Sequence, residues 1–231
     1  MSRFRLLLLC VLFMAVPAAI VASQPPPPPA DLLDALRLGG YVIVLRHGAT
    51  NADAARDGMS NPNKKPAGER QLSDAGRAQA LAIGEGLRRL GIHAGVVMTS
   101  PLQRAVDTAT LLGVGEVKVA PDLAELSNAM SRAENDRRGD ILRKLVGYHS
   151  GPDNFVIVTH RPNIIEAFGE QLADMREGEA AVFEPDFTGD GYRLVARFQA
   201  SDWDLLVQAS RAEELSHAAH CEARKAEPHT D

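Results

Sequence analysis

Short apolar segments rich in Val and Ile alternate with segments of helical periodicity along most of this chain of 231 residues. Short runs of this kind are typical of strands that are buried on both faces of a sheet. Strands and helices in alternation favour an α/β fold, and we expect a three-layer sandwich with a mostly parallel central sheet flanked by helices. The expected strands lie at 41–45, 96–98, 117–119, 155–158, 180–183 and 192–198.

Helices are expected between these strands. Apolar and small residues from Gly76 to Leu90 recur at steps of four and three, which marks one face of a helix. Ser73 is a candidate N-cap for this helix, and Gly91 can end it. The expected helices cover 31–38, 73–90, a segment that begins at Ser100, 132–146 and 162–172.

The N-terminus has the pattern of a secretory signal peptide. Arg3 and Arg5 precede a long uncharged apolar run, and small residues follow near Ser23. We therefore expect a signal peptide at 1–23 and a periplasmic or secreted protein, with no stable membrane span after cleavage. An uncleaved membrane anchor is the alternative, although the run is slightly short for a spanning helix.

Composition bounds the organisation of the rest. The proline-rich segment 24–30 is predicted to be a stiff linker, 31–210 a single domain, and 211–231 a polar C-terminal tail. Cleavage removes two arginines, so 23 basic and 30 acidic residues remain and the net charge becomes −7. Such an acidic domain is not expected to bind nucleic acid. Cys221 is the only cysteine beyond the signal peptide, which excludes an internal disulfide.

Cationic and imidazole side chains follow two of the expected strands. Arg46 and His47 come directly after the strand at 41–45, and His160 follows the strand at 155–158. The carboxyl ends of parallel strands meet at one edge of a sheet, so these side chains can converge although they are distant in sequence. A solvated turn is the alternative for Arg46 and His47.

Arg104 has an unusual position for a cation. We expect Ser100 to be the N-cap of its helix and Pro101 the first helical residue, which places Arg104 in the first turn. The partial positive charge of a helix N-terminus disfavours a cation there, whereas a bound phosphate would stabilise it. The sequence therefore predicts a local anion site at this edge of the sheet, unless Arg104 points to solvent.

Four motifs, in this order and spacing, resemble those of the histidine phosphatase superfamily, branch 1, which is also called the phosphoglycerate mutase-like family. A lone RHG tripeptide is a weak signal, but the combination is specific and spans most of the chain after the linker. The motifs are LRHG at 45–48, LSDAGRAQA at 72–80, TSPLQRAVDTA at 99–109 and VIVTHRPNI at 156–164.

The resemblance implies a role for each residue. His47 matches the nucleophile that becomes a phosphohistidine, and Arg46, Arg104 and His160 match the residues that hold the phosphoryl oxygens. Glu125, in a Leu-x-Glu context, matches the proton donor of the mutase-like branch. The resemblance thus implies a phosphatase of the histidine acid type that hydrolyses phosphomonoesters and requires neither a metal nor a cofactor, and the N-terminal pattern predicts that it is exported. The expected substrate is a phosphorylated small molecule, glycan or lipid headgroup.

Some residues depart from the family pattern. In the acid-phosphatase branch an acid follows the second histidine, but here that residue is Arg161. The mutases continue their glutamate into a Gly-x-Trp-Glu-Gly-like stretch, whereas 126–129 reads LSNA. Thr50 is present, but the asparagine expected near it is replaced by Ala54. These departures favour hydrolysis over mutase activity.

Two other functions are compatible with the same residues. A non-catalytic module could use this pocket to bind a phosphate or a phosphorylated glycan. A metal-dependent hydrolase could use His47 and His160 as ligands, although the sequence has no HExxH-like ligand cluster. The sequence does not indicate the oligomeric state.

Overall fold

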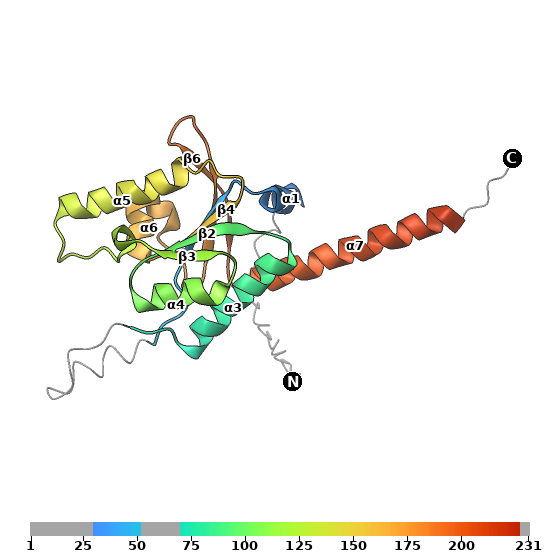
Figure 1. Ribbon diagram of the computed structural model, residues 1–231, viewed down its shortest axis with the longest axis horizontal. Coiled ribbons are helices and arrows are strands. Elements are labelled where there is room, and N and C mark those ends of the chain that lie inside the picture. The colour runs from blue at the N-terminus through green and yellow to red at the C-terminus, as the bar shows by residue number, and fades with distance from the viewer. Residues whose placement is uncertain (1–29, 52–69, 227–231) are drawn as a thin grey trace, which may run out of the picture.

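A central six-stranded sheet organises the chain, as seen in a computed structural model that describes residues 30–51 and 70–226 (Figure 1). The expected signal peptide, most of the linker and residues 52–69 lie outside these residues. The strands are β1 (Val42–Arg46), β2 (Ala94–Thr99), β3 (Glu116–Val119), β4 (Asn154–Thr159), β5 (Ala180–Pro185) and β6 (Tyr192–Phe198).

The strand order is β3-β2-β4-β1-β5-β6, and the sheet is mixed. The strands β3, β2, β4 and β1 run parallel to one another, whereas β5 is antiparallel to β1 and β6 is antiparallel to β5. The expectation of a mostly parallel sheet is therefore confirmed. The antiparallel β5 brings its N-terminal end to the edge where the parallel strands end, because Ala180 pairs with Leu45.

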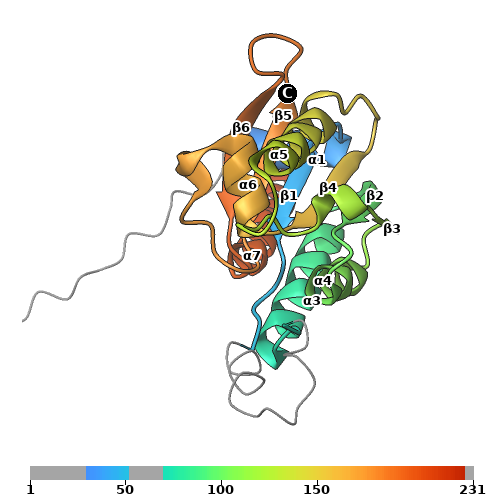
Figure 2. The same cartoon turned by 90° about the vertical axis from the view of Figure 1, so that its left-hand side faces the viewer.

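Helices cover both faces of the sheet, which confirms the three-layer sandwich (Figures 1 and 2). One face packs against α1, α3, α4 and the start of α7, and the other packs against α5, α6 and two short 3₁₀ helices, η1 and η2. These elements are α1 (Ala30–Leu38), α3 (Asp74–Arg89), α4 (Gln103–Leu112), η1 (Pro121–Leu123), α5 (Arg132–Gly147), α6 (Arg161–Phe168), η2 (Glu170–Leu172) and α7 (Asp202–Ala226).

The central strands are buried on both faces, as their composition predicts. In β1, Ile43 and Leu45 pack into one core cluster, while Val42 and Val44 pack into the other. This alternation follows from the two-residue period of a strand, and it fixes the register because a slip by one residue would exchange the two faces. The end of β1 is thereby held at a defined place on the edge of the sheet.

The edge strand β3 does not follow that expectation. All four of its residues are exposed, and Val119 keeps 53% of its surface accessible. It lies at the end of the sheet, and the charged pair Glu116 and Lys118 suits such an edge.

Two helix boundaries differ from the predictions. The N-cap of α4 is Leu102 and not Ser100, and the helix starts at Gln103. The segment expected as one helix at 162–172 is divided, because Gly169 takes a φ of +83° and ends α6 before η2 begins. Such a positive φ favours glycine.

The final helix α7 was not expected from the sequence. Trp203, Leu206 and Val207 anchor its first turns in the core, which is the three-and-four spacing of a helix face. Beyond them the helix leaves the body of the protein (Figure 1), and residues 211–217 are exposed. The helix therefore runs through the boundary predicted between the domain and the polar tail. Across the described residues, no helix is both long and apolar enough to span a membrane.

Candidate active site

The sheet register places the motif residues side by side. Arg46 pairs with Thr159, and Thr99 pairs with Val158, so the next residues of β1, β2 and β4 leave the sheet at neighbouring points. Those next residues are His47, Ser100 and His160. The His47 amide donates to the Thr159 carbonyl at 3.1 Å, and the Ser100 amide donates to the Val158 carbonyl at 3.0 Å. Backbone pairing thus continues into the site and fixes where these side chains start.

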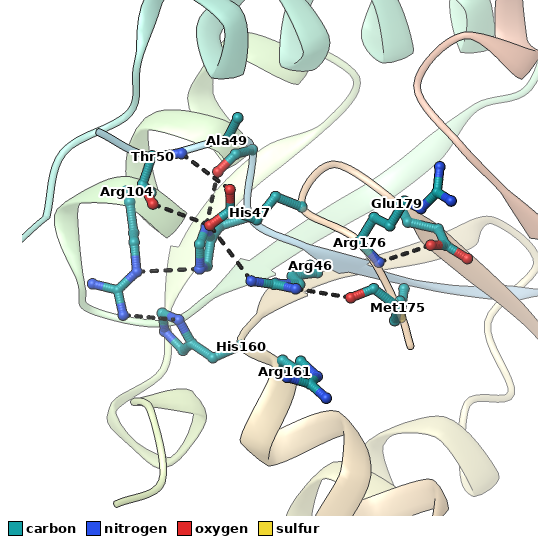
Figure 3. Close-up of polar contacts among 12 residues, drawn as sticks. Arg46, His47, Ala49, Thr50, Arg104, His160, Arg161, Met175, Arg176 and Glu179 are labelled. Atoms are coloured by element: carbon teal, nitrogen blue, oxygen red, sulfur yellow. Dashed lines mark hydrogen bonds and ion pairs between the residues drawn. The ribbon is translucent and has the colours of Figure 1, made fainter. Parts of the chain in front are cut away.

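The Arg104 guanidinium contacts both histidines (Figure 3). Its Nε donates to Nε2 of His47 at 3.2 Å, and its Nη2 lies 3.2 Å from Nδ1 of His160. The same Nη2 donates to Oε2 of Glu125 at 2.6 Å. Arg104 is only 3% exposed, which contradicts the alternative of a solvent-facing arginine. The structure therefore brings Arg104, both histidines and Glu125 together as the sequence predicts.

His47 is held in one tautomer. Its Nδ1 lies 2.9 Å from the Gly48 carbonyl, which can only accept, so Nδ1 carries the proton and Nε2 keeps a lone pair. The pKa of His47 is lowered from 6.5 to about 4, mainly by burial; the Gly48 contact opposes the shift and the charge of Arg104 adds to it. His47 is therefore neutral near neutral pH, with Nε2 available as a nucleophile.

His160 has the opposite arrangement. Its Nδ1 faces the Arg104 donor, and its Nε2 lies 2.7 Å from the Ser100 hydroxyl oxygen. A guanidinium cannot accept, so Nδ1 of His160 holds a lone pair and Nε2 donates to Ser100. Burial and then the Arg104 charge lower the pKa of His160 to about 2. Ser100, expected to be a helix cap, instead orients the second histidine.

Arg46 supplies a second cation to the site. Its Nη1 donates to the Met175 carbonyl at 2.8 Å, and its Nη2 lies 3.5 Å from Oε1 of Glu177. Within the described part of the chain its buried Nε has no hydrogen-bond partner. An unsatisfied buried donor is costly, and an anion bound here would satisfy it.

Glu177 is a site residue that the sequence analysis missed. Its Oε1 accepts from the Thr50 hydroxyl at 3.0 Å, and its Oε2 accepts from the Thr50 amide at 3.3 Å. Together with the Arg46 contact, this carboxylate joins the segment after β1 to the segment before β5. No motif marks Glu177. Only the antiparallel direction of β5, which the sequence does not indicate, brings the residues before that strand to the site.

Glu125 reaches the site from the segment that follows η1. Its side chain is 32% exposed, so one side faces Arg104 and the other side faces an open cavity. Two other acids of this region are committed elsewhere: Asp122 pairs with Arg137 at 2.7 Å, and Glu134 pairs with Arg137 at 2.8 Å. Of these three carboxylates, Glu125 is the one in contact with the cationic centre.

Residues 30–51 and 70–226 contain no group of three or more His, Cys, Asp or Glu side chains arranged to hold a metal ion. The side chain of Cys221 lies outside the described part of the chain.

The low pKa values of the histidines predict a dependence of stability on pH. An unfolded histidine binds a proton below about 6.5, whereas folded His47 binds one only near 4. Between these values the unfolded chain holds more protons, so the free energy of unfolding should fall as the pH falls, by about 3 kcal/mol for His47 alone. Urea denaturation between about pH 7 and about pH 4 measures this loss. His47→Gln should lose less over the same window, and an equal loss in both proteins would contradict the assignment.

Comparison with known proteins identifies the family of this chain. A sequence profile of the histidine phosphatase superfamily, branch 1, matches residues 42–184. The chain is 31% identical over 133 residues to an uncharacterised protein from Picosynechococcus sp., a match that covers 54% of this chain and 72% of that protein.

Solved structures share the fold. The protein of open reading frame Rv3214 from Mycobacterium tuberculosis has a TM-score of 0.51 and 23% identity, with 68% of this chain and 95% of that chain covered. The protein histidine phosphatase SixA, solved in complex with tungstate, has a TM-score of 0.51 and 15% identity, with 70% and 98% covered. The residues that match the profile include β1, α3, α4 and α6 and every residue around Arg104 described above. The chain therefore belongs to the histidine phosphatase superfamily, branch 1.

Proposed function

We propose that this protein is a phosphatase that hydrolyses phosphomonoesters through a phosphohistidine on His47, without a metal or cofactor. The observation that carries the proposal is the contact of Arg104 Nε with Nε2 of a neutral His47, at 3.2 Å. A phosphoryl group bound by Arg104 would lie against the lone pair that attacks it. Phosphoryl transfer depends mainly on such positioning and on neutralisation of charge.

The first step forms a bond from Nε2 of His47 to phosphorus and breaks the bond to the leaving oxygen. Arg46 and Arg104 donate to the phosphoryl oxygens, and the unsatisfied Nε of Arg46 is one of these donors. His160 joins them when its Nε2–H turns from the Ser100 hydroxyl to the phosphoryl group. Glu125 gives its proton to the leaving alkoxide, since its carboxyl group lies between Arg104 and the open cavity. The phosphoryl group then remains on His47 and the alcohol departs.

The second step transfers the phosphoryl group to water. The Glu125 carboxylate takes a proton from the water as its oxygen attacks phosphorus, and Nε2 of His47 leaves with its lone pair restored. Phosphate then departs and Glu125 is again protonated. The LSNA sequence at 126–129, which differs from the stretch found in the mutases, supports water rather than a second hydroxyl of the substrate as the acceptor.

A pair of substrates separates the nucleophile from the acid. Glu125→Gln keeps the shape of the side chain and removes the proton, so hydrolysis of an alkyl phosphate should slow by about 10²–10⁴-fold. A nitrophenyl phosphate should lose far less, because nitrophenolate leaves without protonation. His47→Ala should abolish both reactions. Steady-state rates measured in excess EDTA test this pattern and the proposed independence of metals together.

Three outcomes would each contradict one part of this proposal. If Glu125→Gln slows both substrates equally, or neither, Glu125 is not the acid. If EDTA abolishes activity and zinc restores it, the metal-dependent hydrolase is the better account. If the wild type binds phosphate and hydrolyses neither ester, the protein is a binding module. Arg193→Gln is a suitable control, because Arg193 pairs with Glu184 near the opposite end of β5.

The proposal includes export to the periplasm or the exterior. Support comes from the sequence of residues 1–23, where two arginines precede an uncharged apolar run. N-terminal sequencing of the protein from a native-like host should find a start near Ser23 or Gln24. A mature protein that still begins at Met1 would favour an uncleaved anchor.

A further inference from the structure

A cavity of about 410 Å³ opens beside the phosphate-binding residues. Its volume is in the range of small-molecule sites. Arg46 and Glu125 form the wall nearest to His47, and the first turns of α6 form the rest. If Glu125 protonates the leaving oxygen, the organic part of the substrate has to extend into this cavity. The lining residues are Arg46, Glu125, Arg161, Pro162, Ile165 and Glu166.

The charges of the two acids in this lining are already compensated. Glu125 pairs with Arg104 at 2.6 Å, and Glu166 pairs with Arg132 at 3.1 Å. Neither carboxylate is therefore free to offset a cation of the cavity. For a substrate in the cavity, the negative charge of each acid is therefore largely cancelled by the arginine paired with it.

Arg161 is different. Its Nε donates to the Ala173 carbonyl at 2.5 Å, and no carboxylate among residues 30–51 and 70–226 forms an ion pair with it. The contact with Ala173 limits the freedom of the guanidinium and leaves both Nη groups as donors. Arg161 begins the helix that directly follows His160 (Figure 3), so its charge stands at the boundary between the phosphoryl site and the cavity.

Arg161 also acts on Arg46 through space. Burial lowers the pKa of Arg46, Glu177 opposes the shift, and the charge of Arg161 lowers it further. The two cations near the cavity, Arg46 and Arg161, repel each other. The phosphoryl group of the substrate contacts only the inner one, Arg46, and leaves Arg161 as the outer one. A second negative charge on the substrate would relieve the repulsion at the outer one.

We propose that Arg161 selects phosphomonoesters whose leaving group carries a second anionic group, either a carboxylate or a second phosphate. This inference rests on the phosphatase function proposed above and adds its substrate class. The second anion binds the Nη groups of Arg161, while Pro162 and Ile165 contact the short carbon chain that joins it to the scissile phosphate. A planar guanidinium suits both anions, since each offers two oxygens for paired hydrogen bonds.

Three esters with a short carbon chain test the proposal. They are ethyl phosphate, phosphoglycolate and ethylene glycol bisphosphate, which carry no second anion, a carboxylate and a phosphate respectively. The wild type should prefer at least one of the anionic esters over ethyl phosphate by about tenfold in kcat/KM, the effect of one charge-assisted contact at a partly exposed site. Which anionic ester is preferred distinguishes a carboxylate from a phosphate.

Arg161→Gln should bring that ratio close to one, chiefly by lowering kcat/KM for the anionic esters. Arg161→Glu should reverse the charge preference and favour phosphoethanolamine, whose leaving group carries a cation. Arg193→Gln removes an exposed arginine near the far end of β5 and should keep the wild-type ratio. Circular dichroism of each variant checks that α6 is still folded.

The inference is overturned if the wild type shows no preference, or if Arg161→Gln lowers kcat/KM equally for charged and uncharged esters. The second result would mean that Arg161 acts on the phosphoryl group itself. The proposed function fails separately, if none of the esters is hydrolysed. Calorimetric titration of the same esters into the wild type and Arg161→Gln then measures the preference as a ratio of Kd values.

Discussion

The site depends on one buried guanidinium, that of Arg104. A buried cation is strongly destabilising unless its donors are satisfied, and here the acceptors come from three different segments. They are Nε2 of His47 after β1, Nδ1 of His160 after β4, and the carboxylate of Glu125 after η1. Because the donors of Arg104 face these ring nitrogens, both imidazoles have to be neutral. Burial, and then the charge of Arg104, thus keep His47 unprotonated.

Glu125 is paired with Arg104, and the function proposed for it is to protonate the leaving oxygen. Without a ligand it compensates the charge of Arg104 at 2.6 Å. A bound phosphoryl group would compete for the same Nη2 donor of Arg104. Substrate binding would thus release Glu125 from Arg104 and prepare it to protonate the leaving oxygen. The cavity on its other side is where that oxygen's substituent would extend.

The sequence predicts the sheet and the cluster of cationic and imidazole side chains at its edge, because the strand and helix patterns and the topology of parallel sheets indicate the same arrangement. Strands rich in Val and Ile, followed by helices, predict a parallel sheet, and the shared edge of such a sheet then brings Arg46, His47 and His160 together. The burial of Arg104 follows from the same topology, since its helix starts where β2 ends. The roles of these residues come from the resemblance to the family.

Other features depend on tertiary contacts that no local pattern encodes. Ser100 has the position of an N-cap in the sequence, but the helix begins at Gln103, and the Ser100 hydroxyl accepts from the Leu102 amide and also contacts His160. Glu177 precedes an antiparallel strand, and its place beside Arg46 follows only from the direction of that strand. Strand β3 resembles the buried strands in composition, yet its position at the edge of the sheet exposes it.

The most direct measurement is to find where the phosphoryl group resides during turnover. The protein is mixed with a phosphate-labelled ester for a few milliseconds, quenched in alkaline detergent to preserve phosphohistidine, and mapped by peptide mass spectrometry. The account predicts label on the peptide that contains Arg46-His47-Gly48, at the His47 imidazole, with Nε2 as the site of attachment. Label on His160 or on a carboxylate, or turnover with no labelled peptide under conditions that preserve phosphohistidine, would contradict it.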